Sequence, residues 1–600
     1  MRPVVFGGNV GWLHPASGGR GVVIAGAHGF EDLCTRLFLT QMARNMAARG
    51  LPVLQFDYAG CGDSTGDHEA PERVATWKRD IGAAIDTLKT EAGVADVLVV
   101  GFRLGAMLAP AAIAGREDVA GLALLAPPSS GKTYLRELTG LSRMIDGALP
   151  PFEGQAEAFD GIEVAGFRLS SETVADLRAE DWQADLESLP ARDLLIMPTV
   201  TGAAMAALAD RRRAEDVTVA VETFAGYNML MCDPTSSQVP QPVLERVCRW
   251  AAGHAVEGEA LERIAAPMPP VEGRGYQEWP VTIGGGTEIC GVLCRPAGEA
   301  ADEVTLFLNA GGVPHVGWAR ATVETARTLA AQGKASLRID LPGLGQSEPS
   351  VRKRLHLYDL RTGKDIERVI DWLERAGFHH VNAMGTCAGG YQAFHAARAD
   401  HRIRRLMIVN PLCFVWNSSY ALDMSMWKIY ESSKVAFGKD RTTASADTGD
   451  APAVGEAPTR QGVRASLLRK GRRAVRLAIE AGKSALTDFS PGRLFAGRSV
   501  ERWMADLASR GTKVLVVDTE GDLSIEEIAR HFGPDGERLK RLNGVTTRRL
   551  PASDHTVTPA HARRALTGHL LELLDCPEVG AAEAQAPALD RLVPARQLQS

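Results

Sequence analysis

Three side chains in the second half of the chain have the types and order needed for acyl transfer. Cys387 lies in Gly385-Thr386-Cys387-Ala388-Gly389, between an apolar strand pattern and a helix pattern. Asp522 follows the apolar run VLVVDTEGD, and His555 comes 33 residues later in RRLPASDHTVTP. A thiol deprotonated by an imidazole that a carboxylate orients is a nucleophile for carbonyl carbon. The alternative is that Cys387 is only a small packed residue.

The glycines around Cys387 favour the catalytic alternative. A G-x-nucleophile-x-G turn between strand and helix resembles the nucleophile elbow of the α/β-hydrolase fold, in which the nucleophile has a strained backbone and its neighbours have no room for side chains. That fold also requires the order nucleophile, acid, histidine. Asp518 is a rival for the acid, but it lies at the end of the strand pattern, so Asp522 is preferred.

Further site residues are expected around the elbow. The oxyanion hole should use the backbone N–H of Ala388 and a second N–H from Gly311 or Gly312, in the sequence NAGG. His315 lies near that loop, and together with Thr386 it could line the substrate pocket. The start of the helix after Cys387 would help to stabilise a thiolate.

An internal repeat indicates the fold class. GLPVLQFDYAGCGDSTGD (50–67) and GKASLRIDLPGLGQSEPS (333–350) share an apolar strand ending in Asp and a turn D-x-x-G-x-G-x-S. Asp57 precedes Arg103 by 46 residues, and Asp340 precedes Cys387 by 47. Strand patterns alternate with helical patterns in both halves, which predicts βαβ units. We therefore expect two tandem α/β domains, each with a mostly parallel sheet flanked by helices.

The first copy is expected to be catalytically degenerate. Its elbow, VLVVGFRLGAML, carries Arg103, whose guanidinium stays protonated and cannot act as an acyl nucleophile. The strand pattern DLLIMPTVTGAA lacks the carboxylate, and Asn228 occupies the place of the histidine. Arg103 could bind an anion at the helix start. The alternative, which is preferred, is a structural ion pair.

The domain boundaries follow from these patterns. The first domain should span 1–258 and the second 276–576, with a linker at 259–275 and a flexible tail at 577–600. A lid-like insertion is expected at about 413–510, disordered in part at 438–460. Its basic run at 464–476 has three interpretations, namely a solvated helix face, weak contact with an anionic membrane surface, or docking of an acidic partner such as an acyl carrier protein.

Composition narrows the functional class. Of the 600 residues 45% are hydrophobic and 23% charged, with a formal charge of −6, which gives no general attraction to nucleic acid. The nine cysteines are scattered and indicate neither a metal site nor a disulfide framework, and no cofactor is expected. No apolar run approaches the length of a membrane span, and a cytoplasmic protein is predicted.

The motifs resemble known families. LRIDLPGLGQS together with NPLCFVW is similar to the serine-aminopeptidase-like group of α/β-hydrolases. The G-x-C-x-G-G elbow is similar to those of dienelactone hydrolases and polyhydroxyalkanoate synthases, which use Cys-Asp-His triads. The first half resembles hydrolase-like proteins of exosortase systems, through G-x-R-L-G and EVAGFRLS (163–170).

These observations predict a cysteine acyl hydrolase or acyltransferase with an acyl-cysteine intermediate. Its substrate would be a small acyl compound, such as a thioester of coenzyme A or of a carrier protein, or an activated ester. The two domains are expected to contact each other. The rival hypothesis is a non-catalytic scaffold or binding protein built from two hydrolase-like domains. It does not explain why Asp522 and His555 are retained.

Overall fold

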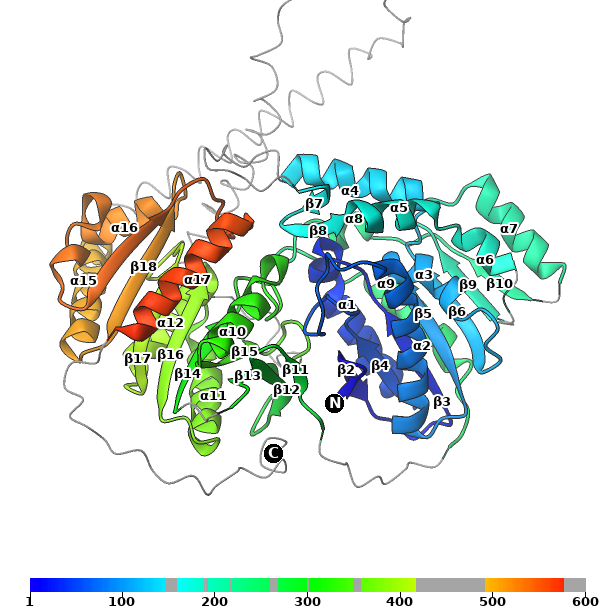
Figure 1. The fold of residues 1–600 in the computed structure, drawn as a ribbon, viewed down its shortest axis with the longest axis horizontal. Helices are drawn as coiled ribbons and strands as arrows, with labels where there is room; N and C mark the ends of the chain where they lie inside the picture. Colours follow the sequence, from blue (N-terminus) through cyan, green and yellow to red (C-terminus); the bar gives the residue numbers. More distant parts are fainter. Residues whose placement is uncertain are drawn as a thin grey trace, which may run out of the picture.

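The two strand–turn–helix repeats lie at the centres of two separate sheets, one in each half of the chain (Figure 1). The computed structural model describes residues 1–145, 159–187, 189, 193–215, 217–258, 268–298, 302–348, 358–416 and 491–576. Both sheets are mostly parallel and carry helices on their faces, so the prediction of two tandem α/β domains is confirmed.

The first sheet has the order β1-β2-β4-β3-β5-β6-β9-β10, with only β1 and β2 antiparallel to their neighbours. Its strands are β1 (Arg2–Phe6), β2 (Asn9–His14), β3 (Arg20–Ala25), β4 (Val53–Phe56), β5 (Asp96–Phe102), β6 (Val119–Leu125), β9 (Asp193–Met197) and β10 (Thr218–Val221). The helices of this half are α1 (Phe30–Ala47), α2 (Arg73–Ala92), α3 (Leu104–Ala112), α4 (Gly131–Ile145), α5 (Ser171–Ala179), α6 (Trp182–Glu187), α7 (Ala203–Arg213), α8 (Tyr227–Leu230) and α9 (Gln241–Ala252).

The second sheet repeats this order as β12-β13-β15-β14-β16-β17-β18-β19, with β11 added at the edge. Its strands are β11 (Val271–Gly273), β12 (Tyr276–Ile283), β13 (Ile289–Pro296), β14 (Glu303–Leu308), β15 (Ala335–Asp340), β16 (His380–Thr386), β17 (Ile403–Val409), β18 (Lys513–Thr519) and β19 (Val545–Leu550). The helices are α10 (Ala321–Ala331), α11 (Gly363–Arg375), α12 (Ala388–Ala399), α15 (Pro491–Ser509), α16 (Ser524–Phe532) and α17 (Ala560–Asp575).

The central strands are buried on both faces, which explains why they appear in the sequence as continuous apolar runs rather than as alternating patterns. In parallel sheets the carboxyl ends of all strands meet at one edge, where ligand sites of open α/β sheets are built. The elbow and the turns after β14 and β18 lie at this edge of the second sheet.

Two expected boundaries differ from the structure. The strand β11 falls inside the expected linker 259–275 and pairs with β12, so the second sheet begins before residue 276. The helix α15 falls inside the expected insertion 413–510, but its Val500, Met504 and Leu507 are buried in the core of the second domain. This apolar face makes α15 part of the domain. The expected disordered segment 438–460, the basic run 464–476 and the tail 577–600 lie outside the described residues.

The contacts between the two halves are made by equivalent residues of the two copies. The antiparallel ends of the two sheets approach each other near the centre of the molecule (Figure 1). Arg44 and Arg327 occupy equivalent positions in α1 and α10. Arg44 Nη2 donates to the Gln346 backbone oxygen and Arg327 Nη2 to the Asp63 backbone oxygen, each at 2.8 Å. Each copy therefore donates a hydrogen bond from an equivalent arginine to the glycine-rich turn of the other. The same surfaces meet in both directions, as in an isologous dimer interface.

Asp63 is the centre of a buried ionic network at this boundary. Its side chain contacts His315 Nε2 at 2.6 Å and Arg338 Nη2 at 2.8 Å, and all three side chains are fully buried. Burial would lower the pKa of His315, but Asp63 and Asp340 on either side of the ring raise it to about 10. Glu278 completes the pairing of Arg338. The expected contact between the domains is thus a buried, charge-paired one.

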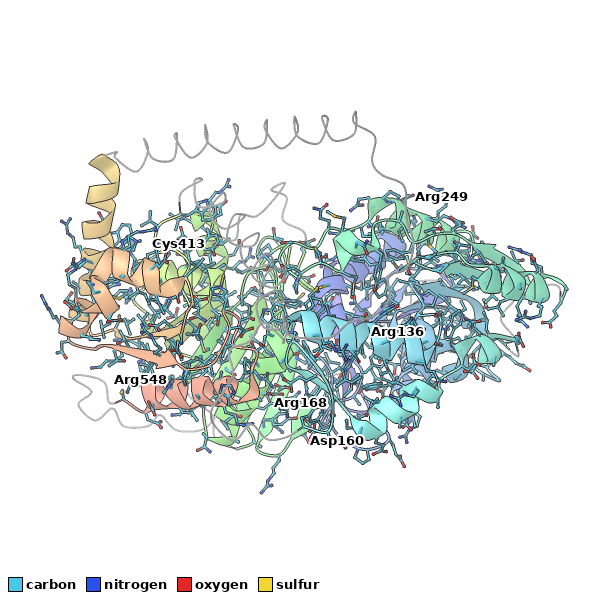
Figure 2. All side chains as sticks on the ribbon, turned by 90° about the horizontal axis from the view of Figure 1, so that it is seen from above. Arg136, Asp160, Arg168, Arg249, Cys413 and Arg548 are labelled. Atoms are coloured by element: carbon cyan, nitrogen blue, oxygen red, sulfur yellow. The ribbon has the colours of Figure 1, made fainter. Side chains whose placement is uncertain are left out.

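A two-stranded hairpin of the first half reaches the same boundary. It consists of β7 (Gly161–Val164) and β8 (Phe167–Ser170), and Figure 2, in which Arg168 is labelled, shows it close to the second half. A Cβ on Gly166 at its turn would lie 2.6 Å from the backbone oxygen of Thr558, so the turn packs closely on the second half.

No helix in the described part of the chain is long and apolar enough to cross a membrane.

Candidate active site

The turn between β16 and α12 has the geometry of a nucleophile elbow. Cys387 has φ 56° and ψ −118°, a left-handed conformation that costs energy for a residue with a side chain. A Cβ on Gly385 would lie 2.1 Å from the Gly389 backbone, and one on Gly389 would lie 2.8 Å from the backbone oxygens of Leu308 and Asn309. Both positions therefore require glycine, as expected from the sequence. This conformation places the Cys387 sulfur at the start of α12.

Asp522 and His555 meet Cys387 at the carboxyl edge of the sheet. Asp522 is in the turn after β18, and its Oδ2 lies 2.8 Å from His555 Nδ1. Burial would lower the pKa of His555, but the neighbouring Cys387 and Asp522 raise it well above its ordinary value. Burial would raise the pKa of the Cys387 thiol, but the charge of His555 and a hydrogen bond from its ring lower it. The pair therefore favours a thiolate beside an imidazolium.

The rival acid lies elsewhere. Asp518 is on β18 itself and forms an ion pair with Arg549 of the neighbouring strand β19. Its carboxylate is therefore paired with an arginine of the sheet, whereas the carboxylate that contacts His555 Nδ1 is that of Asp522.

Asn410, which the sequence reasoning did not select, connects the loops of the acid and the histidine. Its Nδ2 donates to the backbone oxygen of His555 at 2.8 Å, and its Oδ1 accepts the Thr519 N–H at 2.9 Å. The side chain is fully buried. Its sequence signal was an asparagine directly after a strand, in NPLCFVW.

The loop that is expected to supply the second oxyanion donor follows β14 and contains Gly311 and Gly312. The Ala388 N–H interacts with the Cys387 sulfur. The Gly312 N–H donates to Thr235 Oγ1 at 3.1 Å, so it is occupied. The Gly311 N–H has no acceptor among the described residues, and Gly311 has φ 65°. Of the two expected donors, Gly311 is therefore the one left for an oxyanion.

His315 and Thr386 both line a small cavity of about 50 Å³ beside the elbow. The cavity is bounded by the backbone of Asn309 and Ala310 and by the end of β16. Both nitrogens of His315, however, are occupied by Asp63 and Asp340. His315 therefore forms part of the cavity wall, while its two ring nitrogens contact Asp63 of the first domain and Asp340 of the second.

Tyr358 is a second residue that the sequence did not reveal. Its hydroxyl lies 3.6 Å from the Cys387 sulfur, and its ring stacks on Trp416 with centroids 4.6 Å apart. The hydrogen bond from Tyr358 contributes to lowering the pKa of Cys387. No motif marks Tyr358, because its contact with the elbow is made across the fold.

Replacing Tyr358 with phenylalanine should raise the pKa of Cys387, because one donor to the thiolate is lost. The alkylation rate of Cys387 by iodoacetamide at neutral pH should fall roughly threefold to tenfold, and its pH profile should move upward. Tyr391→Phe is the control, since Tyr391 packs in the same cluster and is not one of the hydrogen-bond donors that lower the pKa of Cys387. Unchanged pH profiles in Tyr358→Phe would exclude this role.

Arg103 occupies the equivalent elbow of the first domain, with φ 51° and ψ −106°. Its Nε donates to Glu31 at 2.7 Å and its Nη2 to Glu137 at 2.7 Å, and the Tyr134 and Tyr227 rings pack against the guanidinium. Glu31 is buried as well. This geometry favours the structural ion pair over the anion site, because two carboxylates of the same domain already bind the guanidinium.

Two family models match, one in each half. Residues 20–158 match the model described as serine aminopeptidase, S33, and residues 306–442 match the one described as α/β-hydrolase fold. No protein of curated function matches the chain.

Solved structures of similar fold align with about half of the chain. Est1E from Butyrivibrio proteoclasticus with ferulic acid bound is 16% identical (TM-score 0.30), with coverage of 42% of this chain and 97% of Est1E. Dienelactone hydrolase from Anabaena variabilis is 14% identical (TM-score 0.30), with coverage of 50% and 98%. The Pyrococcus furiosus esterase Pf2001 is 14% identical (TM-score 0.31), with coverage of 50% and 90%.

The first match names a serine enzyme, whereas this chain has Arg103 and Cys387 at its two elbows. The elbow geometry, the repeated strand order and the two family matches agree for both halves. Each half of the chain therefore has the α/β-hydrolase fold, and the protein consists of two domains of that fold.

Proposed function

We propose that the second domain is a cysteine acyl hydrolase or acyltransferase that works through an acyl-cysteine intermediate. The observation that carries this proposal is the chain of contacts from Asp522 through His555 to Cys387, with the 2.8 Å contact between carboxylate and imidazole. The family matches support an enzyme of the hydrolase type more generally.

The steps follow from the positions of the three groups. The Cys387 thiolate attacks the carbonyl carbon of the acyl substrate, and the carbonyl oxygen becomes an anion facing the N–H groups of Ala388 and Gly311. Collapse of this intermediate breaks the bond to the leaving group, which takes the proton from the His555 imidazolium. A water, alcohol or amine then attacks the acyl-cysteine. His555 accepts its proton, and the Cys387 thiolate leaves.

Thioesters are the substrate class that this chemistry favours. Acylating a thiol produces a thioester, so attack on a plain oxygen ester is uphill, and the intermediate tends to expel the thiolate that has just attacked. Exchange of one thiolate for another is nearly isoenergetic. Acyl groups on coenzyme A or on a carrier protein, and activated esters, meet this requirement.

The wild-type protein should therefore have a higher kcat/KM for a thioester than for the simple alkyl ester of the same acyl group. S-ethyl thioacetate and ethyl acetate, which share both the acyl group and the alkyl group, give a direct comparison. Cys387→Ser should shift the ratio toward the oxygen ester. If the wild type prefers the alkyl ester and the serine variant keeps that preference, the thioester assignment is wrong, whereas the nucleophile assignment is tested separately by Cys387→Ala.

A further inference from the structure

The first domain contacts the oxyanion loop of the second. Its segment Asp233–Ser237 lies against Gly311 and Gly312, and Thr235 Oγ1 accepts the Gly312 N–H at 3.1 Å. A Cβ on Gly311 would lie 2.7 Å from Thr235 Oγ1, and one on Gly312 would lie 2.7 Å from Thr235 Cα. The two backbones are therefore packed without room for a side chain on the oxyanion loop.

Thr235 itself is held firmly by the first domain. Asp233 Oδ1 accepts the backbone N–H of Thr235 at 2.9 Å and that of Ser236 at 3.0 Å. Ser237 Oγ donates to the Cys34 backbone oxygen of α1 at 2.9 Å. This side-chain-capped turn fixes the hydroxyl of Thr235 relative to the first domain.

The segment has a counterpart in the second domain that explains its position. It lies between β10 and α9, and the loop between the equivalent β19 and α17 carries His555. The first domain thus lacks the catalytic histidine in this loop, and the loop instead reaches the active site of the other copy. The loop with His555 is also contacted from the first domain, since Gly166 of the β7–β8 turn packs on Thr558.

We propose that Thr235 of the first domain is a positioning residue for acyl transfer at Cys387. By accepting the Gly312 N–H, its hydroxyl fixes the loop so that the Gly311 N–H is directed, with that of Ala388, at the developing oxyanion. The inference rests on the proposed function of the second domain. Through this contact the first domain takes part in the reaction, although it has no cysteine or histidine of its own at the equivalent positions.

The experiment separates oxyanion stabilisation from thiolate reactivity in the full-length protein. Acylation of Cys387 by S-phenyl thioacetate passes through an oxyanion, whereas alkylation by iodoacetamide is a direct displacement without one. Thr235→Val keeps the shape of the side chain but removes the hydroxyl, and Thr235→Ser keeps the hydroxyl. Both rates are measured by mass spectrometry at Cys387, and the steady-state kcat and KM are measured for the same thioester.

Thr235→Val should slow acylation roughly tenfold, by lowering kcat and not by raising KM. Its alkylation rate should match that of the wild type, and Thr235→Ser should restore acylation. Equal acylation rates in Thr235→Val and the wild type overturn the inference alone. A parallel fall of acylation and alkylation also overturns it, because the substitution then disturbs Cys387 itself. Absence of acyl-Cys387 in the wild type overturns the proposed function as well.

Discussion

Replacing Cys387 with alanine should lower turnover of thioesters by a factor on the order of 10⁴ or more, because the acyl group loses its only attachment point. Alanine fits the site, since the turn is defined by Gly385 and Gly389, so the midpoint of thermal unfolding should change little. Labelling by an electrophilic acyl probe, located by mass spectrometry, should disappear together with turnover.

The control is Cys576→Ala, which removes an exposed cysteine at the end of α17. It should retain both turnover and labelling at Cys387. If Cys387→Ala keeps substantial turnover, the acyl-cysteine mechanism is wrong. The scaffold hypothesis would gain support if the wild-type protein were neither labelled nor active.

Replacing Asp63 with asparagine should destabilise the folded protein by about 3–5 kcal/mol, because His315 and Arg338 each lose one of their two buried carboxylate partners and keep only Asp340 and Glu278. Asp63, His315 and Arg338 are all fully buried, so water cannot screen the loss. The change should appear as a lower denaturant midpoint. Asp67→Asn is the control, since the Asp67 side chain is 69% exposed in the same turn region. A loss below about 1 kcal/mol would show that the network is not needed for stability.

The same network gives stability a pH dependence. His315 has a folded pKa of about 10 against an ordinary value of 6.5. A raised folded pKa contributes stability that is fully present below the unfolded pKa and is lost as the pH rises through the folded one. The contribution of His315 should therefore decline between about pH 6.5 and pH 10, and Asp63→Asn should flatten this part of the curve.

The sequence was informative where structure is local. A strand, a glycine-bounded turn and a helix are contiguous, so the elbow at Cys387 could be predicted from the types and order of its residues. The parallel sheet brings the ends of β16 and β18 to one edge. Asp522 is preferred over Asp518 because Asp518 lies at the end of the strand pattern and Asp522 in the turn that follows it. The same reasoning identified two domains from the repeat.

The features that the sequence could not reveal depend on contacts between distant segments of the chain. Tyr358 reaches the sulfur across the fold, and Thr235 reaches the oxyanion loop from the other half of the chain. His315 was expected at the pocket, but its ring is bound by Asp63, a residue 252 positions away. The sequence places the helix α15 in the expected insertion because it comes before the next clear strand pattern, and its burial in the domain core becomes visible only in the fold.

The hydrogen bonds by which each copy contacts the glycine-rich turn of the other affect which substitutions a duplicated chain can accept. Because Arg44 and Arg327 each hydrogen-bond to the turn of the other copy, a substitution that disrupts either turn should weaken both halves. A substitution at Arg103, whose partners Glu31 and Glu137 belong to its own half, should have a local effect. We therefore expect the duplicated chain to tolerate change at its first elbow more readily than in the turn D-x-x-G-x-G-x-S that begins at Asp57.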